Sequence, residues 1–223
     1  MSRSNADKPS ADLIDALFID QVQFKNLTPA AQPFVIFVTG VAGSGKSYSM
    51  VQVRENASFN VFTIQADDYR KLHPKIKELI VKHGIDNAHQ YTGSFSHRTA
   101  LSLRDKVILH RLNVVYEATF GNLDTAKSLI DCFRDNGYRV AVLALPVNLA
   151  LSIQRNESRY QIKLEDIHTL PRKVSLLDIQ KMSDNFIKNI NELEKYGVNI
   201  YRMSAGQNSR LVLQDMIANF QAA

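Results

Sequence analysis

The sequence has one cysteine and no long apolar run. A single cysteine excludes an internal disulfide framework, and Cys132 lies in a predicted helix, which favours a small core residue over a nucleophile. No run of 18 apolar residues exists, so no transmembrane helix is expected. The first ten residues are polar and lack the apolar stretch of a signal peptide. These absences favour a cytoplasmic protein without a membrane partner.

Concentrated positive charge and metal-ligand patterns are also lacking. The formal net charge of +5 suits an anionic ligand, but no run of five lysines and arginines occurs. Scattered basic residues argue against a nucleic-acid partner. The six histidines lack ligand spacing with cysteine or acidic residues, so no protein-bound zinc is expected. No G-x-S-x-G motif of a serine hydrolase is present.

Apolar residues make up 45% of the 223 residues, which is enough for the core of one α/β domain. We predict a polar tail and a helix within residues 1–33, and a main domain over residues 34–223. In that domain helical and strand patterns alternate, which predicts a mostly parallel five-stranded sheet flanked by helices. The predicted strands are 34–39, 59–65, 112–117, 139–145 and 198–203. The predicted helices are 12–22, 46–56, 72–83, 97–110, 124–136, 147–160, 175–196 and 209–220.

The strongest chemical signal is a complete G-x-x-x-x-G-K-[ST] phosphate loop between a predicted strand and a predicted helix. Its glycines let backbone N–H groups turn toward phosphate oxygens, and the helix start adds positive dipole. We expect Lys46 to bind the β- and γ-phosphates and Ser47 to bind Mg²⁺. The predicted nucleotide-binding residues are Gly40, Val41, Ala42, Gly43, Ser44, Gly45, Lys46, Ser47 and Tyr48.

Acidic residues follow the next two predicted strands. Asp67 and Asp68 come after the second strand, where one carboxylate could accept a proton from an attacking hydroxyl while the other caps a helix; both could also be caps. Glu117 ends the third strand, where it could hold a Mg²⁺-bound water, hold a substrate hydroxyl or lie in solvent. Thr119, two residues on, could bind a substrate.

A third group of candidates lies in residues 150–175, which carry Arg155, Arg159 and Arg172. Mobile arginines can stabilise the charge that develops on a transferred phosphoryl group, and a closing lid excludes water. We therefore predict an arginine-rich helical lid, with an ordinary solvated surface as the alternative.

Three segments, taken in order, resemble the zeta toxin family of P-loop kinases. They read G-V-A-G-S-G-K-S at 40–47, I-Q-A-D-D-Y-R-K-L-H-P at 64–74 and N-V-V-Y-E-A-T at 113–119. The phosphate loop is generic, whereas the aspartate-to-His-Pro segment at this spacing is specific. The resemblance covers roughly residues 34–185 and implies a P-loop NTPase fold.

The resemblance also implies roles for individual residues. It makes Asp67 the general base, leaves Asp68 a structural role, and makes Glu117 and Thr119 the substrate contacts. It assigns Arg159 and Arg172 to the lid as catalytic residues together with Lys46, and places Arg98 near the substrate. The implied cofactors are ATP and Mg²⁺.

Members of this family resemble kinases that phosphorylate an amino-sugar hydroxyl of UDP-N-acetylglucosamine and are blocked by a small antitoxin protein. The resemblance therefore implies that acceptor and that partner. The family's acidic and second basic substrate contacts fall at Leu101 and Gly121 here, so another small acceptor, such as a nucleoside or an antibiotic, stays an alternative. A nucleotide-binding regulator without transfer activity is a further alternative.

Overall fold

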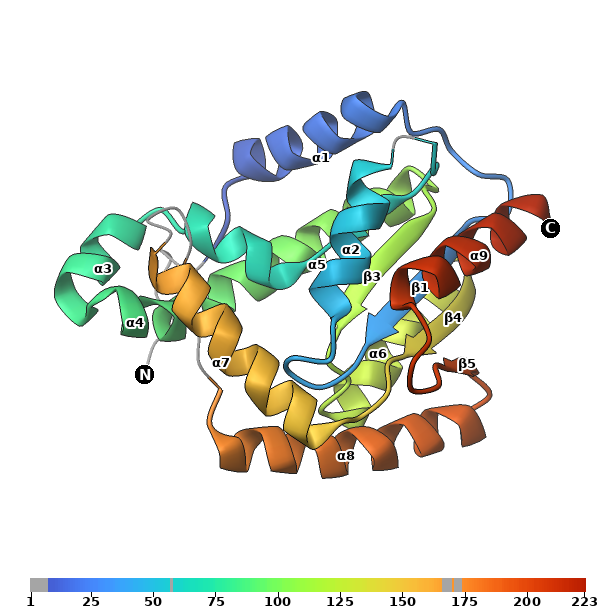
Figure 1. The fold of residues 1–223 in the computed structure, drawn as a ribbon. Coiled ribbons are helices and arrows are strands. Elements are labelled where there is room, and N and C mark those ends of the chain that lie inside the picture. Colours follow the sequence, from blue (N-terminus) through green and yellow to red (C-terminus); the bar gives the residue numbers. More distant parts are fainter. Residues whose placement is uncertain (1–7, 57, 166–169, 171–173) are drawn as a thin grey trace.

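The computed structural model describes residues 8–56, 58–165, 170 and 174–223. The described residues form a five-stranded parallel sheet in the order β2-β3-β1-β4-β5 (Figure 1). This confirms the predicted α/β architecture. The strands are β1 (Phe34–Thr39), β2 (Phe62–Ile64), β3 (Val114–Ala118), β4 (Arg139–Ala144) and β5 (Asn199–Arg202).

Strand β1 is the middle strand and lies between β3 and β4. In the register, Phe37 is opposite Tyr116 on one side and Val142 on the other. All six residues of β1 are buried, as expected for a parallel strand that is covered on both faces. Because the strands are parallel, their carboxyl ends meet at one edge, and segments that follow them converge there.

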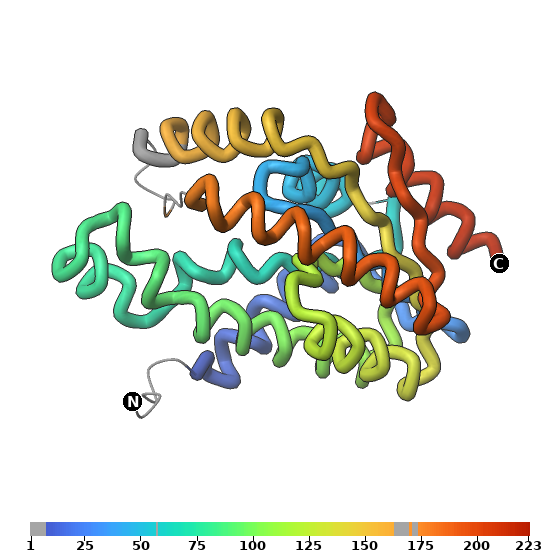
Figure 2. The backbone as a smooth tube through the Cα atoms, turned by 90° about the horizontal axis from the view of Figure 1, so that it is seen from below, coloured from blue at the N-terminus to red at the C-terminus, as the bar shows by residue number. Residues whose placement is uncertain are grey.

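Helices cover both faces of the sheet (Figures 1 and 2). Alternation along β1 divides the core, since Val35 and Phe37 belong to one buried cluster and Ile36 and Val38 to the other. The first cluster includes residues of α1 (Ala11–Lys25), α5 (Gly93–Leu109), α6 (Leu123–Arg134) and α8 (Leu176–Lys195). The second includes residues of α2 (Lys46–Glu55) and α9 (Ser209–Ala222).

Helix α7 (Leu149–Glu165) lies along α8 and across the end of the sheet that carries the phosphate loop (Figures 1 and 2). Most of its residues fall within the stretch 150–175, where the sequence predicts a helical lid. Among the helices of the described residues, none has both the length and the apolar character needed to cross a membrane.

The single helix predicted over residues 72–83 is wrong. The structure has a 3-10 helix, η2 (Ala66–Leu72), then a break at Pro74, then α3 (Ile76–His83). Proline disfavours the helical conformation of the residue before it, and His73 is extended with φ −58° and ψ 128°. The break places the acidic residues on their own short helix at the strand end.

Other boundaries differ by a few residues. Strand β2 is shorter than predicted, and α5 starts four residues before the predicted residue 97. Two short helices, α4 (Ile85–Ala88) and η3 (His89–Tyr91), were not predicted. Cys132 is half-buried on α6 and not in the core, contrary to the expectation.

The N-terminal helix α1 packs against the edge of the sheet. Phe18 stacks on Phe62 with ring centroids 5.6 Å apart, and Asp15 forms a 2.5 Å ion pair with Lys106 of α5. Lys25 is buried, and its Nζ donates hydrogen bonds to the carbonyl oxygens of Val53 (2.8 Å) and Val61 (3.2 Å). The helix is therefore attached through both apolar and polar contacts.

Candidate active site

The phosphate loop connects β1 to α2, in the strand–loop–helix context that the motif requires. Gly43 and Gly45 adopt φ values of +78° and +102°, which only glycine adopts at low cost. A Cβ on Gly43 would clash with the backbone of Ser152 on α7, whose Cα would lie 2.9 Å away. The loop therefore depends on glycine for its turn and for the close approach of α7.

Lys46 begins α2 and is buried with 8% of its surface exposed. Its Nζ donates hydrogen bonds to the carbonyl oxygens of Gly40 (2.8 Å) and Val41 (3.0 Å), inside the curve of the loop. The buried Ser44 Oγ has no hydrogen-bond partner within the described part of the chain. A buried lysine beside an unpaired hydroxyl is a polar environment suited to an anion.

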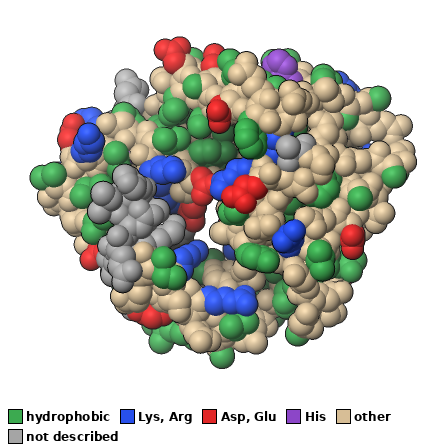
Figure 3. Space-filling model, turned by 45° about the horizontal axis from the view of Figure 1, so that its top comes forward, with side chains coloured by type: hydrophobic (Ala, Val, Ile, Leu, Met, Phe, Trp, Pro, Cys, Tyr) green, Lys and Arg blue, Asp and Glu red, His purple; other side chains and the backbone are tan. Residues whose placement is uncertain are grey.

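A cavity of about 230 Å³ adjoins the loop, and we call it the nucleotide cavity. Basic and acidic side chains gather at a hollow on one face of the molecule (Figure 3). The nucleotide cavity brings together candidates from four parts of the chain that are distant in sequence. Beside loop residues that include Lys46 and Ser47, its lining includes Asp67, Glu117, Thr119, Arg155 and Arg159.

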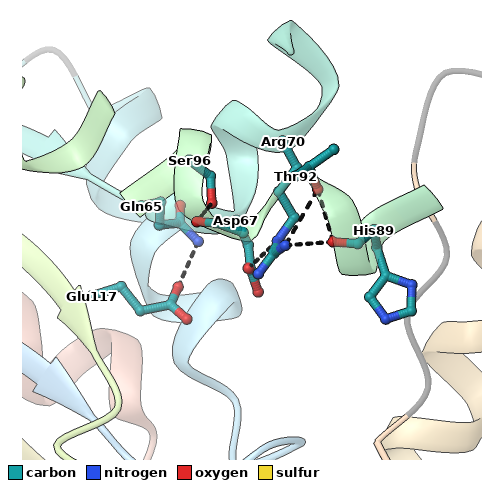
Figure 4. Close-up of polar contacts among 8 residues, drawn as sticks. Gln65, Asp67, Arg70, His89, Thr92, Ser96 and Glu117 are labelled. Atoms are coloured by element: carbon teal, nitrogen blue, oxygen red, sulfur yellow. Dashed lines mark hydrogen bonds and ion pairs between the residues drawn. The ribbon is translucent and has the colours of Figure 1, made fainter. Parts of the chain in front are cut away.

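Asp67 and Asp68 are adjacent but have different partners. Asp68 forms a 2.6 Å ion pair with Arg54 of α2, which agrees with a structural role. The Asp67 side chain is 52% exposed, lines the cavity and accepts a 2.7 Å hydrogen bond from Nε of Arg70 (Figure 4). Gln65 holds the N-cap position of η2 and makes no side-chain cap hydrogen bond there. Neither aspartate is therefore the N-cap residue of this helix.

Glu117 lies at the end of β3, half-buried, and accepts a 2.7 Å hydrogen bond from Nε2 of Gln65 (Figure 4). Burial raises the pKa of Glu117 above its ordinary value, while the charge of Lys46 and the Gln65 hydrogen bond act in the opposite direction. Gln65 itself is buried. Sequence reasoning missed Gln65, although its place at the end of β2 was a signal.

Residues 119–122 connect β3 to α6, and the chain turns there. Phe120 is in the left-handed region at φ 47°, which is uncommon for a bulky residue. Asn189 of α8, also buried, donates a 2.8 Å hydrogen bond to the Phe120 carbonyl oxygen and so supports the turn. The turn directs the exposed Thr119 toward the nucleotide cavity.

A second cavity of about 230 Å³ shares Glu117 and Thr119 with the first, and we call it the acceptor cavity because the family resemblance predicts these two residues as substrate contacts. Gly121 lies in its lining, as does His97 of α5. Arg98, next to His97, is half-buried and is not among the described residues that line either cavity. The substrate contact predicted at Arg98 stays a prediction.

The arginines of α7 lie over the phosphate loop. Arg155 and Arg159 are one helical turn apart and both line the nucleotide cavity. A Cβ built on Gly45 would lie 3.7 Å from Nη1 of Arg155, which places that guanidinium beside the loop. Arg155 was not singled out as catalytic from the sequence, although its four-residue spacing from Arg159 was visible. Arg172 lies outside the described residues.

Comparison with known proteins identifies the family. The sequence model of the zeta toxin family matches residues 19–211 of the chain. The chain belongs to the zeta toxin family. Toxin PezT of Streptococcus pneumoniae serotype 4 (strain ATCC BAA-334 / TIGR4) is 26% identical to it over an alignment of 196 residues, and the match covers 86% of this chain and 75% of PezT.

Solved structures agree with this zeta toxin fold. A chain from the PezAT chromosomal toxin–antitoxin system of S. pneumoniae superposes with a TM-score of 0.68 at 19% identity, covering 89% of this chain and 80% of that chain. A putative kinase from Chloroflexus aurantiacus superposes with a TM-score of 0.57 at 10% identity, covering 86% and 99%. The fold of this zeta toxin family member is thus a P-loop kinase fold.

This zeta toxin family member has a third cavity, of about 690 Å³, which also adjoins the phosphate loop. Its lining includes Leu151 and Met203, and it shares Gly45, Tyr48 and Arg155 with the nucleotide cavity. The loop and Arg155 thus border two cavities, and Asp67 and Glu117 line one of them.

Proposed function

We propose that this protein is an ATP- and Mg²⁺-dependent kinase that phosphorylates a hydroxyl of a small acceptor. The acceptor we propose is UDP-N-acetylglucosamine, which the family resemblance implies. The supporting observation is that one cavity joins a phosphate loop, the exposed carboxylate of Asp67 and the arginines of α7. This combination supports phosphoryl transfer to a hydroxyl better than nucleotide binding alone, because a carboxylate can remove the hydroxyl proton.

In the proposed reaction Asp67 accepts the proton of the acceptor hydroxyl. The hydroxyl oxygen forms a bond to the γ-phosphorus, the bond from that phosphorus to the β–γ bridging oxygen breaks, and ADP leaves. Lys46, Arg155 and Arg159 stabilise the charge on the phosphoryl oxygens. Arg172 stays a predicted contributor to this group, and Glu117 and Thr119 orient the acceptor.

The residues beside the phosphate loop fit Mg²⁺. Ser47 is exposed and lines the same cavity as Asp67 and Glu117, so the available ligands are oxygen atoms, which Mg²⁺ prefers. Among the described residues there is no cluster of three or more His, Cys, Asp or Glu that could hold a metal, so phosphates and water would complete its coordination. Mg²⁺ when bound would neutralise charge on the β- and γ-phosphates.

The third cavity suits the nucleoside part of ATP. It adjoins the phosphate loop, its described lining includes Tyr48 and apolar residues, and Asp67 is not among those residues. Nucleotide bases are flat and largely apolar on their faces, so aromatic and aliphatic side chains favour them. The base would then lie in this cavity and the γ-phosphate would lie near Asp67.

A second acceptor class has one specific observation in its favour. The described residues that line the acceptor cavity include no lysine and no arginine. A diphosphate is usually bound by such cations, so this cavity suits an uncharged, hydroxyl-bearing group. An uncharged acceptor, such as a nucleoside, is therefore the second candidate, and for UDP-N-acetylglucosamine the sugar is the part that fits.

The proposed partner is a small antitoxin protein. The support is that the similar chain of S. pneumoniae comes from a toxin–antitoxin system. We extend this to the present chain as a proposal, and with it the expectation that the active kinase is toxic to cells that express it.

The experiment is transfer of ³²P from γ-labelled ATP to UDP-N-acetylglucosamine and to a panel of nucleosides and sugars, with Mg²⁺ present. Asp67→Asn should lower kcat by about 10²–10⁴-fold, the usual contribution of a general base. Asp68→Asn is the matched control, because it changes the adjacent carboxylate that pairs with Arg54. The control should keep most of the activity.

Two results would count against the proposal. Full activity of Asp67→Asn would exclude Asp67 as the base. ATP binding by the wild type without transfer to any member of the panel, and without toxicity on expression, would favour a regulator that binds nucleotide and has no transfer activity.

A further inference from the structure

We infer that Arg70 is a positioning residue that fixes the carboxylate of Asp67 for proton transfer. This inference rests on the proposed function, because it assumes that Asp67 is the base. Arg70 belongs to the specific segment 64–74, yet no catalytic role falls on it from the sequence. The structure gives it contacts to two segments that are separated by about twenty residues.

The contacts of Arg70 use different nitrogens of one guanidinium. Nε donates to Oδ1 of Asp67 at 2.7 Å. Nη1 donates to the carbonyl oxygen of His89 at 2.8 Å and to Oγ1 of Thr92 at 3.3 Å. Figure 4 shows Arg70 between Asp67 on one side and the turn at residues 89–92 on the other. The guanidinium therefore joins the carboxylate to a second, separate part of the backbone.

The two partners differ in burial. The Arg70 side chain is 17% exposed, whereas the Asp67 side chain is 52% exposed. Arginine stays charged at any pH of interest, so a mostly buried guanidinium needs fixed acceptors. The arginine is thus the fixed member of the pair, and the exposed carboxylate takes its orientation from it.

The turn at residues 89–92, which we call the far anchor of Arg70, is itself fixed by hydrogen bonds. Thr92 is fully buried, and its Oγ1 donates a 2.9 Å hydrogen bond to the His89 carbonyl oxygen. With its proton used in that bond, the Thr92 hydroxyl can serve Arg70 as an acceptor. The turn at residues 89–92 therefore offers two oxygen acceptors in a fixed arrangement.

The local helix explains how Arg70 reaches Asp67. Residues 66–72 form a 3-10 helix, in which side chains three positions apart lie directly above one another. Asp67 and Arg70 have this spacing. The short helix ends before the break at Pro74. Asp67 and Arg70 both lie within that helix, and its geometry brings the two side chains together.

Only an arginine satisfies all of these contacts at once. Lysine carries the same charge but has no planar fork, so it cannot hold the carboxylate and the turn in fixed directions together. A misplacement of about 1 Å in a reacting group can cost about 10²-fold in rate. Loss of Arg70 should therefore affect the chemical step more than ATP binding.

The test compares Arg70→Gln with Arg54→Gln in the full chain. Arg54 is the matched control, since it forms a 2.6 Å ion pair with the neighbouring Asp68. With ATP and UDP-N-acetylglucosamine, Arg70→Gln should lower kcat by about 10–10²-fold while the KM for ATP stays within about twofold. Arg70→Lys should recover part of the loss, and Arg54→Gln should behave like wild type.

Two further measurements separate positioning from folding. Thr92→Val removes one oxygen acceptor of the far anchor and leaves the residues Arg70 and Asp67 unchanged. It should lower kcat by about threefold to tenfold, a smaller factor than in Arg70→Gln. The acidic limb of the pH–rate profile should move to higher pH in Arg70→Gln, because a cation beside a carboxylate favours its ionised form. A defect in folding alone would lower kcat and kcat/KM by the same factor and leave the pH limb in place, so the position of the pH limb separates positioning from folding.

The inference is wrong if Arg70→Gln and Arg54→Gln have the same kcat and the same pH limb. If the wild type transfers phosphate to no acceptor, the proposed function fails first, and NMR titration of the ¹³C-labelled Asp67 carboxyl group decides on Arg70. The titration should move to higher pH in Arg70→Gln and not in Arg54→Gln. An unchanged titration in Arg70→Gln would overturn the inference whatever the reaction is.

Discussion

The carboxylates at the site differ mainly in the side chains that bind them. Asp67 and Asp68 are neighbours of the same chemical type, yet Asp68 pairs with Arg54 and Asp67 lines the nucleotide cavity beside Arg70. Glu117 shows the same principle, because Gln65 donates to it from the end of the neighbouring strand. Fixed donors orient each of these carboxylates, so their partners are the most informative positions to change.

Gln65→Leu should move the titration of Glu117. The Gln65 hydrogen bond favours the charged carboxylate, so its removal should raise the pKa of Glu117 further above the ordinary value. If the ionised form binds the acceptor, activity in the variant should fall at a higher pH than in wild type as the pH is lowered. The pH dependence of kcat/KM for the acceptor measures this.

Gln21→Leu is the control for that prediction. Gln21 of α1 bonds to Thr63 of β2, the strand that precedes Gln65, and does not line the three described cavities, so the same substitution is made without loss of the Glu117 contact. Its pH profile should match the wild-type profile. Equal profiles for Gln65→Leu and wild type would show that the Gln65 donor has no influence on the titrating group.

At the scale of elements, the phosphate loop and α7 depend on each other. The loop turns at Gly43, and the backbone of Ser152 on α7 lies where a side chain on Gly43 would be. Arg155 and Arg159 continue along the same helix and line the cavity. The close backbone contact therefore sets where the arginines stand relative to the loop.

Gly43→Ala should lower both stability and ATP affinity. An alanine at φ +78° costs about 1–2 kcal/mol from backbone strain, and the clash with Ser152 adds to that cost. Because the clash pushes α7 and the loop apart, the Kd for ATP should rise about tenfold or more. Denaturant unfolding and calorimetric ATP titration measure the two effects.

Gly137→Ala is the matched control. Gly137 has φ +76°, but a Cβ there would meet no atom within 4 Å. It should show the strain cost alone, about 1–2 kcal/mol, with unchanged ATP affinity. Equal losses in the two variants would mean that the contact with Ser152 has no consequence.

The elements themselves were largely predictable from the sequence. The phosphate loop, the five strands and most helices follow from apolar patterns and glycine positions. The helix over 72–83 was wrong because the effect of Pro74 on His73 outweighed the apolar spacing. The short helices α4 and η3 carry little apolar pattern of their own, so the sequence offered no signal for the turn that anchors Arg70.

On the scale of the whole molecule, α1 is joined to the sheet by a buried charge. Lys25 donates to carbonyl oxygens near the end of α2 and before β2, and burial together with the charge of Arg54 lowers its pKa from 10.5 to about 8. A cation near a helix C-terminus is favourable, yet the burial of its charge has a cost.

This arrangement predicts a pH-dependent stability. Between about pH 8 and 10.5 the unfolded chain holds the Lys25 proton more tightly than the folded chain, so the contribution of Lys25 to the free energy of unfolding rises with pH. A lowering of that size corresponds to about 3 kcal/mol, at about 1.4 kcal/mol per pH unit.

The measurement is denaturant unfolding of wild type and Lys25→Met at several pH values. The stability of wild type relative to the variant should be nearly constant below pH 8 and should increase up to about pH 10.5. The comparison cancels the buried tyrosines Tyr69, Tyr116 and Tyr138, whose pKa values are raised by burial and which act in both proteins. A difference that does not vary with pH would show that Lys25 titrates normally.

The sequence by itself determined the phosphate loop, the alternation of strands and helices, and the candidate residues Lys46, Asp67 and Glu117. These follow from local patterns, because turns and apolar periodicity depend on near neighbours. Only the tertiary structure decided which side chains meet. It paired Asp68 with Arg54, anchored Arg70 to the turn at residues 89–92, brought Gln65 to Glu117, and left Arg98 outside both cavities. The reason is physical: contacts across parallel strands depend on register and crossover packing, which join residues far apart in the sequence.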